Sequence, residues 1–310
     1  ELIKSGMEIP PGTLIMEDPP VHTIHRKLLS RVFTPRRMAE LEPKIREYCV
    51  SCLDPLVGEA GFDVIAELGA QMPMRVIGML LGIPDADQEQ VRDRVDAMLR
   101  TEDGAPMDVS RTFDHAQFFG EYVDWRAKNP SDDLMTDMLQ AEFEDENGVT
   151  RRLTRDELII YISIVAGAGN ETTTRLIGWA AKLLADHPDQ RKQIVGDRAL
   201  VPQTIDEVLR YEPPGPLAAR NVLEDGEHDR QKVPAGSVVV FLIASANRDD
   251  RRFPDGDRFD IHRKAAQHLT FGYGVHYCLG ANLAKLEGRV ALEELLARFP
   301  EWEVDLDRAR

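Results

Sequence analysis

The sequence contains little cysteine, few aromatic residues and no long hydrophobic run. Three of its 310 residues are cysteines, Cys49, Cys52 and Cys278, which are too few for a disulfide framework and suit a reducing cytosol. No stretch approaches the roughly 20 consecutive apolar residues of a membrane span. No signal peptide is visible, although the chain starts at Glu1 without a methionine, which leaves targeting open. These absences favour a cytoplasmic globular protein.

Positive charge is also scarce, because 54 acidic residues outweigh 38 lysines and arginines and give a formal net charge of −16. This charge argues against non-specific binding to nucleic acid. Residues 21–39, in contrast, contain several basic residues and no acid: Arg26, Lys27, Arg31, Arg36 and Arg37. This basic run indicates an anionic ligand or an acidic partner, unless it is only the solvated face of a helix.

Cys49 and Cys52 form a C-x-x-C pair, a spacing that also occurs in zinc and redox sites. The sequence has no second pair at ligand spacing and no strand–turn context around this one. The favoured interpretation is two small, half-buried residues on one face of a helix.

Hydrophobic periodicity predicts a mainly α protein with a small β region. The clearest helix begins at Thr154, which forms a capping box with Glu157, and ends near His187, because Pro188 cannot continue it. Residues 158–168 are apolar nearly all round, which is typical of a helix in the centre of a domain.

Further along the chain, a helix is expected around Gln203–Tyr211. Two short strands are expected at Leu217–Leu223 and Ser237–Ala244, with a turn at Pro234–Gly236 between them.

The most informative segment surrounds Cys278. Gly272 and Gly274 punctuate the loop before it and can adopt conformations closed to other residues. An amphipathic stretch that predicts a helix follows, and the N–H groups of a helix N-terminus favour a thiolate. Gly280 keeps one side of the sulfur uncrowded. The pattern indicates a cysteine held ionised and open on one side, as an axial metal ligand must be, although an isolated cysteine here would more simply be a buried loop residue.

The whole string resembles the haem-binding signature of the cytochrome P450 family, F-G-x-G-x-H-x-C-x-G. It matches at every specified position: Phe271, Gly272, Gly274, His276, Cys278 and Gly280. The resemblance implies that haem b (iron protoporphyrin IX) is the cofactor and that Cys278 is the axial ligand of its iron. It also implies that Phe271, Gly272, His276 and Gly280 contact the haem.

A second motif lies inside the long predicted helix. A buried carboxylate and hydroxyl are costly unless they have a use, although a kink with a satisfied threonine is the simpler alternative. The segment resembles the oxygen-activation motif of the family, small-Gly-x-acid-Thr, at Ala168, Gly169, Glu171 and Thr172. The resemblance implies that Glu171 and Thr172 are catalytic and carry protons to bound oxygen. It also places Ala168 and Gly169 beside the haem.

His22 and Arg26 are spaced i and i+4, on one helical face within the basic run. Arginine suits carboxylates such as the haem propionates. The family has a matching H-x-x-x-R for one propionate, and Arg220 and His276 match the partners of the other. The remaining basic residues would lie around the proximal face, where a ferredoxin docks in the family: Lys27, Arg31, Arg36, Arg37, Lys285 and Arg289.

Glu207 and Arg210 match the E-x-x-R of the family, with Arg263 as the third member of the network. By that resemblance the three residues brace the core beneath the cysteine loop.

The resemblance runs from about Pro19 to Phe299. It implies a single cytochrome P450 domain over residues 1–310, with a helical core around the haem and a long central helix. We expect this domain to be incomplete at both termini, as a fragment of a longer gene product.

The implied activity is that of a monooxygenase, which inserts one oxygen atom of O2 into a hydrophobic small molecule. Electrons would come from NAD(P)H through a reductase and a ferredoxin. Val165, Ala168 and Thr172 are expected to line the distal pocket, together with Leu217 and Ala218. A peroxide-driven peroxygenase and a non-catalytic haem-thiolate sensor are the alternatives, and the acid–alcohol pair argues against both. An inactive remnant is a third.

Overall fold

The structure is a computed structural model that describes residues 12–31, 33–99, 110–265 and 267–307, with the backbone alone for residues 95–99 and 110–117. The helices are α1 (Val21–Ser30), α2 (Pro35–Leu53), α3 (Met72–Leu81), α4 (Gln88–Leu99), α5 (Ser110–Lys128), α6 (Leu134–Gln140), α7 (Arg155–Asp186), α8 (Pro188–Gly196), α9 (Val201–Tyr211), α10 (Ile243–Ala246) and α11 (Ala281–Arg298). The strands are β1 (Glu142–Glu144), β2 (Thr150–Arg152), β3 (Ala218–Asn221), β4 (Gly226–His228), β5 (Gln231–Val233) and β6 (Val238–Phe241). The predicted mainly helical architecture is confirmed.

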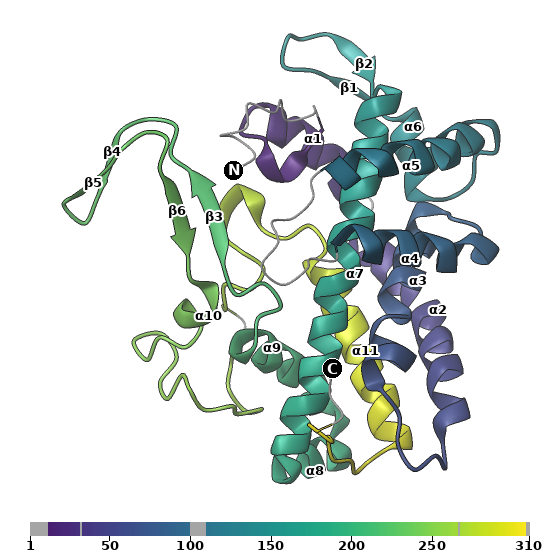
Figure 1. The fold of residues 1–310 in the computed structure, drawn as a ribbon, viewed down its shortest axis with the longest axis vertical. Helices are drawn as coiled ribbons and strands as arrows, with labels where there is room; N and C mark the ends of the chain where they lie inside the picture. The colour runs from purple at the N-terminus through teal and green to yellow at the C-terminus, as the bar shows by residue number, and fades with distance from the viewer. Residues whose placement is uncertain (1–11, 32, 100–109, 266, 308–310) are drawn as a thin grey trace.

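The long helix α7 forms the axis of the molecule. Its first turn has the predicted capping box, in which the Thr154 hydroxyl accepts from the Glu157 N–H at 3.2 Å and the Glu157 carboxylate accepts from the Thr154 N–H at 2.8 Å. Helices α3, α5, α9 and α11 pack against it. Figure 1 shows α2 to α6 on one side of α7 and the β3–β6 ribbon on the other.

Two clusters of buried hydrophobic residues share α7 and α11. The larger joins these helices to α2, α3 and α5, and the smaller joins them to α8 and α9. The predicted apolar stretch of α7 contributes Leu158, Ile159 and Ile162 to the larger cluster. Among the described residues, no helix combines the length and the apolar character needed to cross a bilayer.

The two predicted strands are present as β3 and β6, which pair antiparallel with Ala218 opposite Phe241. Two further hairpins, β1–β2 and β4–β5, were not predicted. Their strands have three residues each and are mainly polar, so they have no hydrophobic alternation. The turn stabilises the β1–β2 hairpin, because the Asp145 carboxylate accepts hydrogen bonds from the N–H groups of Asn147 and Val149 at 3.0 Å.

A buried ion pair on α9 holds the irregular segment 247–263 in place. The guanidinium of Arg210 donates to both carboxylate oxygens of Glu207 at 2.7 and 2.8 Å, and both side chains are fully buried. Arg210 also donates to the carbonyls of Asn247 and Gly256 at 2.8 and 2.7 Å, and Arg263 lies 3.3 Å from Glu207. The predicted three-residue network is confirmed.

Replacing Glu207 with alanine leaves the Arg210 charge buried without its carboxylate partner. We expect Glu207→Ala to lower the free energy of unfolding by about 3–5 kcal/mol in a urea titration followed by circular dichroism. Glu142→Ala is the control, because Glu142 pairs with Arg152 at 2.9 Å while both side chains are more than half exposed. Its loss should stay below about 1 kcal/mol. Equal losses in the two variants would contradict the bracing role of Glu207.

Candidate functional site

The loop before α11 positions Cys278. The Cys278 N–H donates to the Phe271 carbonyl at 2.8 Å and closes the loop on itself. Gly272 and Gly274 have φ angles of 74° and 75°, a region that favours glycine, so both glycines are required by the backbone as predicted. Gly280 is the N-cap of α11. The sulfur therefore lies where the loop enters the helix, as the sequence predicted.

Cys278 is a free cysteine and an exposed residue. Desolvation raises the pKa of the thiol, while the N–H of Gly280 and the charge of Arg26 act in the opposite direction. The predicted influence of the helix N-terminus is present, because the Gly280 N–H lowers the pKa of the thiol, but desolvation outweighs it. A metal cation at the sulfur would favour the thiolate, because a coordinating thiol is deprotonated. There is room for such a group, because a Cβ added at Gly274 or Gly280 would meet no atom within 4 Å.

Basic side chains from three segments converge beside this loop. The ring of His22 in α1 lies 4.3 Å from the ring of His276, measured between centroids. Burial, followed by the charges of His276 and Arg26, lowers the pKa of His22. Burial, followed by the charge of Arg220 in β3, lowers the pKa of His276, while Asp18 acts against this. The structure thus brings His22, Arg26, Arg220 and His276 together.

His22 has an unmet demand for a hydrogen-bond partner. It is 2% exposed, and neither ring nitrogen has a partner among the described residues. A buried polar group in this state is costly, so a polar ligand group is expected beside it. A carboxylate could accept a hydrogen bond from the His22 ring and could also balance the surrounding positive charge. The residues present therefore fit the propionates of a haem.

In α7 the Thr172 hydroxyl donates to the Ala168 carbonyl at 2.9 Å, the bond to the preceding turn that the sequence predicted. Ala168 and Thr172 are exposed, on the open side of the helix. Gly169 differs, because a Cβ there would approach Ile77 of α3 to 2.5 Å. Close packing of α3 and α7 explains this glycine. Val165, expected in the same pocket lining, is buried in the core.

Glu171 has a partner that the sequence analysis missed. Its carboxylate forms an ion pair with Arg175, one turn further along α7, and both side chains are about half exposed. Arg175 also donates to the Pro214 carbonyl at 3.2 Å, which connects α7 to the segment before β3. The i, i+4 spacing was a signal that could have found this pair.

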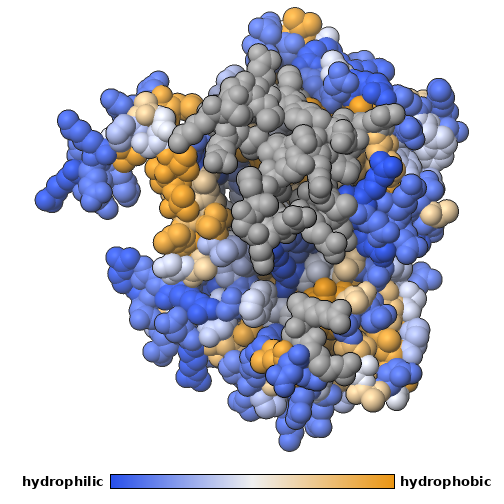
Figure 2. Space-filling view, viewed as in Figure 1, coloured by the Kyte–Doolittle hydropathy of each residue, from blue (hydrophilic) through white to orange (hydrophobic). Residues whose placement is uncertain are grey.

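Large apolar side chains are exposed along β3 and β6. Leu217 is 57% exposed and Leu242 is 62% exposed. Val238, Val240 and Phe241 also have about half of their surface exposed. Figure 2 shows a hydrophobic band over this ribbon. Contiguous exposed apolar surface of this kind is typical of binding clefts.

Comparisons with known proteins agree with this arrangement. The family model described as Cytochrome P450 matches residues 108–309. The chain is 36% identical over 300 residues to the putative cytochrome P450 123 of Mycobacterium tuberculosis, with 95% of this chain and 73% of that protein covered. The chain belongs to the cytochrome P450 family.

Other relatives of this cytochrome P450 have named activities or ligands. The vitamin D(3) 25-hydroxylase of Pseudonocardia autotrophica is 36% identical over 293 residues, covering 94% of this chain and 72% of that protein. The structure of CYP109E1 from Bacillus megaterium in complex with testosterone has a TM-score of 0.86 and 33% identity, covering 96% of this chain and 81% of that one. Family membership confirms the predicted cytochrome P450 fold, a monooxygenase activity and haem b as the cofactor.

The basic residues expected on the proximal face of this cytochrome P450 are mostly neutralised. Arg36 pairs with Glu40 at 2.9 Å, Arg37 with Asp132 at 2.6 Å and Lys285 with Asp206 at 2.7 Å. Arg289 pairs with Glu42 at 2.5 Å. Across the described part of the chain, no ion pair involves Lys27 or Arg31.

The two cysteines of the C-x-x-C pair lie on α2. Cys49 is buried and Cys52 half-buried in α2, both as free cysteines. Burial raises the pKa of Cys49 to about 12. The described residues contain no group of ligands that could hold a metal around them. The favoured interpretation of two packed residues on one helix agrees with these observations.

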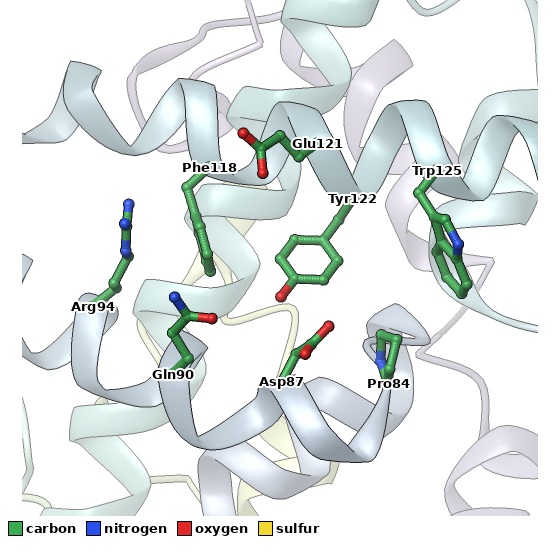
Figure 3. Close-up of a pocket in the computed structure, with 8 residues that line it drawn as sticks. All are labelled: Pro84, Asp87, Gln90, Arg94, Phe118, Glu121, Tyr122 and Trp125. Atoms are coloured by element: carbon green, nitrogen blue, oxygen red, sulfur yellow. The ribbon is translucent and has the colours of Figure 1, made fainter.

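A separate pocket of about 620 Å³ lies between α4 and α5. Figure 3 shows Phe118, Tyr122 and Trp125 along one face of α5, with Asp87 opposite Tyr122. Burial, followed by Asp87, raises the pKa of Tyr122 to about 12. The guanidinium of Arg94 already covers the Phe118 ring at 4.5 Å. No candidate haem residue lines this pocket.

Glu287 is a buried acid in α11 that the sequence analysis did not single out. It is 1% exposed, and its Oε2 has no hydrogen-bond partner among the described residues. Burial raises the pKa of this carboxyl well above the ordinary value of 4.5. The folded state therefore holds the proton more tightly than the unfolded state does.

The contribution of Glu287 to stability is fully present below its unfolded pKa and is lost as the pH rises through the folded pKa. Glu287→Gln mimics the protonated acid at every pH. We expect the free energy of unfolding of this variant, relative to wild type, to rise as the pH increases above the ordinary pKa of 4.5, by at most about 1.4 kcal/mol per pH unit. Urea titrations at several pH values measure this difference. A difference that does not change with pH would show that Glu287 is ionised in the folded protein.

Proposed function

We propose that this cytochrome P450 binds haem with Cys278 as the axial ligand of the iron and oxidises hydrophobic small molecules with O2. The observation that carries the proposal is the buried, unpartnered His22 within a group of basic side chains beside the Cys278 loop. When bound, haem supplies the oxygen chemistry, in which one oxygen atom enters the substrate and the other leaves as water.

The basic side chains hold the cofactor through its two propionates. His22 and Arg26 of α1 take one propionate, and Arg220 and His276 take the other. Both arginines can form paired hydrogen bonds with a carboxylate. Burial is the largest cause of the lowered pKa values of His22 and His276, and repulsion by neighbouring positive charges is the second, which an anionic ligand would relieve. Phe271, Gly272 and Gly280 shape the loop against the haem, and Ala168 leaves space on the other side.

Thr172 and Glu171 deliver protons. The Thr172 hydroxyl donates to the Ala168 carbonyl, so its oxygen can still accept a hydrogen bond from a water on the open side of α7 and hold that water in place. Glu171 is half exposed and paired with Arg175, which allows it to exchange protons with solvent when that ion pair opens. The proton path then runs from solvent to Glu171, through water, to Thr172.

The substrate is a hydrophobic molecule of small to moderate size. Its binding wall consists of Leu217, Ala218 and the exposed apolar residues of β6, which offer few hydrogen-bonding groups. Vitamin D(3) and testosterone are named with two relatives of the chain, and both are largely apolar. A terpenoid, steroid or other lipid-like molecule is the class that fits these observations.

Electrons come from NAD(P)H through a reductase and a ferredoxin. Lys27 and Arg31 near the end of α1 provide positive charge for an acidic ferredoxin, because no ion pair occupies them in the described part of the chain. The free state of Cys49, Cys52 and Cys278 fits a cytoplasmic protein.

Thiolate ligation is tested with carbon monoxide. We expect the dithionite-reduced protein to show the red-shifted Soret band of a thiolate-bound haem, and Cys278→Ala to lose this band. Cys52→Ala is the matched control, because Cys52 lies in α2 within the helical core, and should keep the band. Retention of the band in Cys278→Ala would exclude Cys278 as the ligand.

The proton role of Thr172 is tested by separating product formation from consumption of NAD(P)H. With a ferredoxin system, we expect Thr172→Ala to consume NAD(P)H while product falls by about 10- to 100-fold and hydrogen peroxide rises. Thr172→Ser keeps the hydroxyl and should keep most of the product. Unchanged product in Thr172→Ala, or product from wild type only with added peroxide, would exclude this route.

A further inference from the structure

Helix α1, which carries His22 and Arg26, has few intrinsic means to hold its position. It is 10 residues long and its N-cap, Pro20, makes no side-chain hydrogen bond. Helices of this length are marginal in isolation, so contacts with the rest of the protein must fix it. At its C-terminal half, Leu28 and Leu29 are buried. Its N-terminal half, which presents His22, needs a separate anchor.

His25 and Glu17 provide that anchor. The Nδ1 of His25 lies 2.8 and 2.9 Å from the two carboxylate oxygens of Glu17, and the side chains are only 4% and 11% exposed. Because a carboxylate only accepts, Nδ1 must carry the proton and donate. Hydrogen bonds of this kind are stronger than neutral ones.

Both partners are fixed by further contacts. The Glu17 carboxylate also accepts from the Gly12 N–H at 2.9 Å, and the turn before it, at residues 14–16, packs on α1. The His25 ring stands edge-on to Tyr161 of α7 at 5.5 Å and to Phe143 of β1 at 6.1 Å. The pair therefore connects α1 to the central helix and to the segment before α1.

We propose that Glu17 and His25 are positioning residues, which hold α1 so that His22 and Arg26 face the haem propionates. This inference rests on the proposed haem site. His25 is one turn from His22 along the helix, but its ring contacts Tyr161 while that of His22 contacts His276. A rotation or shift of α1 would move both rings together. His22 and His25 are spaced i and i+3 and are neighbours on one face of the helix, so the pair that fixes His25 also sets the position of His22 and Arg26.

Haem transfer to excess apomyoglobin tests the inference. We expect Glu17→Ala and His25→Leu each to release haem about tenfold faster than wild type, and the double variant to be no faster than either single variant. Glu17→Gln keeps an acceptor, and His25→Asn keeps an amide N–H close to the place of Nδ1. Both should stay within about threefold of wild type.

Asp124→Ala is the control, because it removes an exposed ion pair with Arg155 at 2.8 Å and should leave haem release unchanged. The propionate-bending bands in resonance Raman spectra should shift in Glu17→Ala and His25→Leu. Lower stability of the apoprotein with unshifted bands and unchanged haem release would overturn the positioning role, because it would be the result of a purely structural contact.

The variant Arg26→Leu distinguishes failure of the positioning role of Glu17 and His25 from failure of the proposed propionate site. If Arg26→Leu accelerates haem release while Glu17→Ala and His25→Leu do not, the inference about the pair is wrong and the haem site stands. If Arg26→Leu has no effect either, the proposed propionate site itself is wrong.

Discussion

The buried ion pair of Glu207 and Arg210 is the interaction on which the path of the chain before the Cys278 loop depends. Each charge is fully enclosed, so each needs the other, and the backbone of segment 247–263 completes their hydrogen bonds. That segment has little regular structure of its own, and it leads directly into the loop that carries Cys278. A buried charged pair, and not a hydrophobic core, thus fixes the conformation of this irregular segment.

The functional residues lie on elements of very different rigidity. Thr172 and Glu171 belong to α7, which is anchored in both hydrophobic clusters, whereas His22 and Arg26 lie on a short helix at the edge of the fold. Arg220 comes from a two-stranded ribbon. The groups proposed as catalytic therefore lie on the exposed side of a helix that is anchored in the core, while the groups assigned to cofactor retention are held by local contacts such as that of Glu17 with His25.

Local signals in the sequence were sufficient for α7, α11 and the cysteine loop. The capping box of Thr154 and the glycines with positive φ depend only on residues close in sequence, and both are present in the structure. The missed features depend on contacts between distant segments. The pairing of Glu17 with His25 and the burial of Glu287 cannot be read from spacing, because the same residues on a solvated surface would look identical.

The lack of a side chain at Gly169 allows α3 and α7 to pack closely. The side chain of Ile77 in α3 lies close to the α7 backbone here, since a methyl group added at Gly169 would approach Ile77 to 2.5 Å. Thr172 lies one turn away on the same rigid helix. A larger residue at Gly169 would therefore force the Ile77 side chain or one of the two helices to move, and any movement of α7 would carry the Thr172 hydroxyl with it. The position of the turn proposed to activate oxygen is thus sensitive to a single methyl group at the contact between α3 and α7.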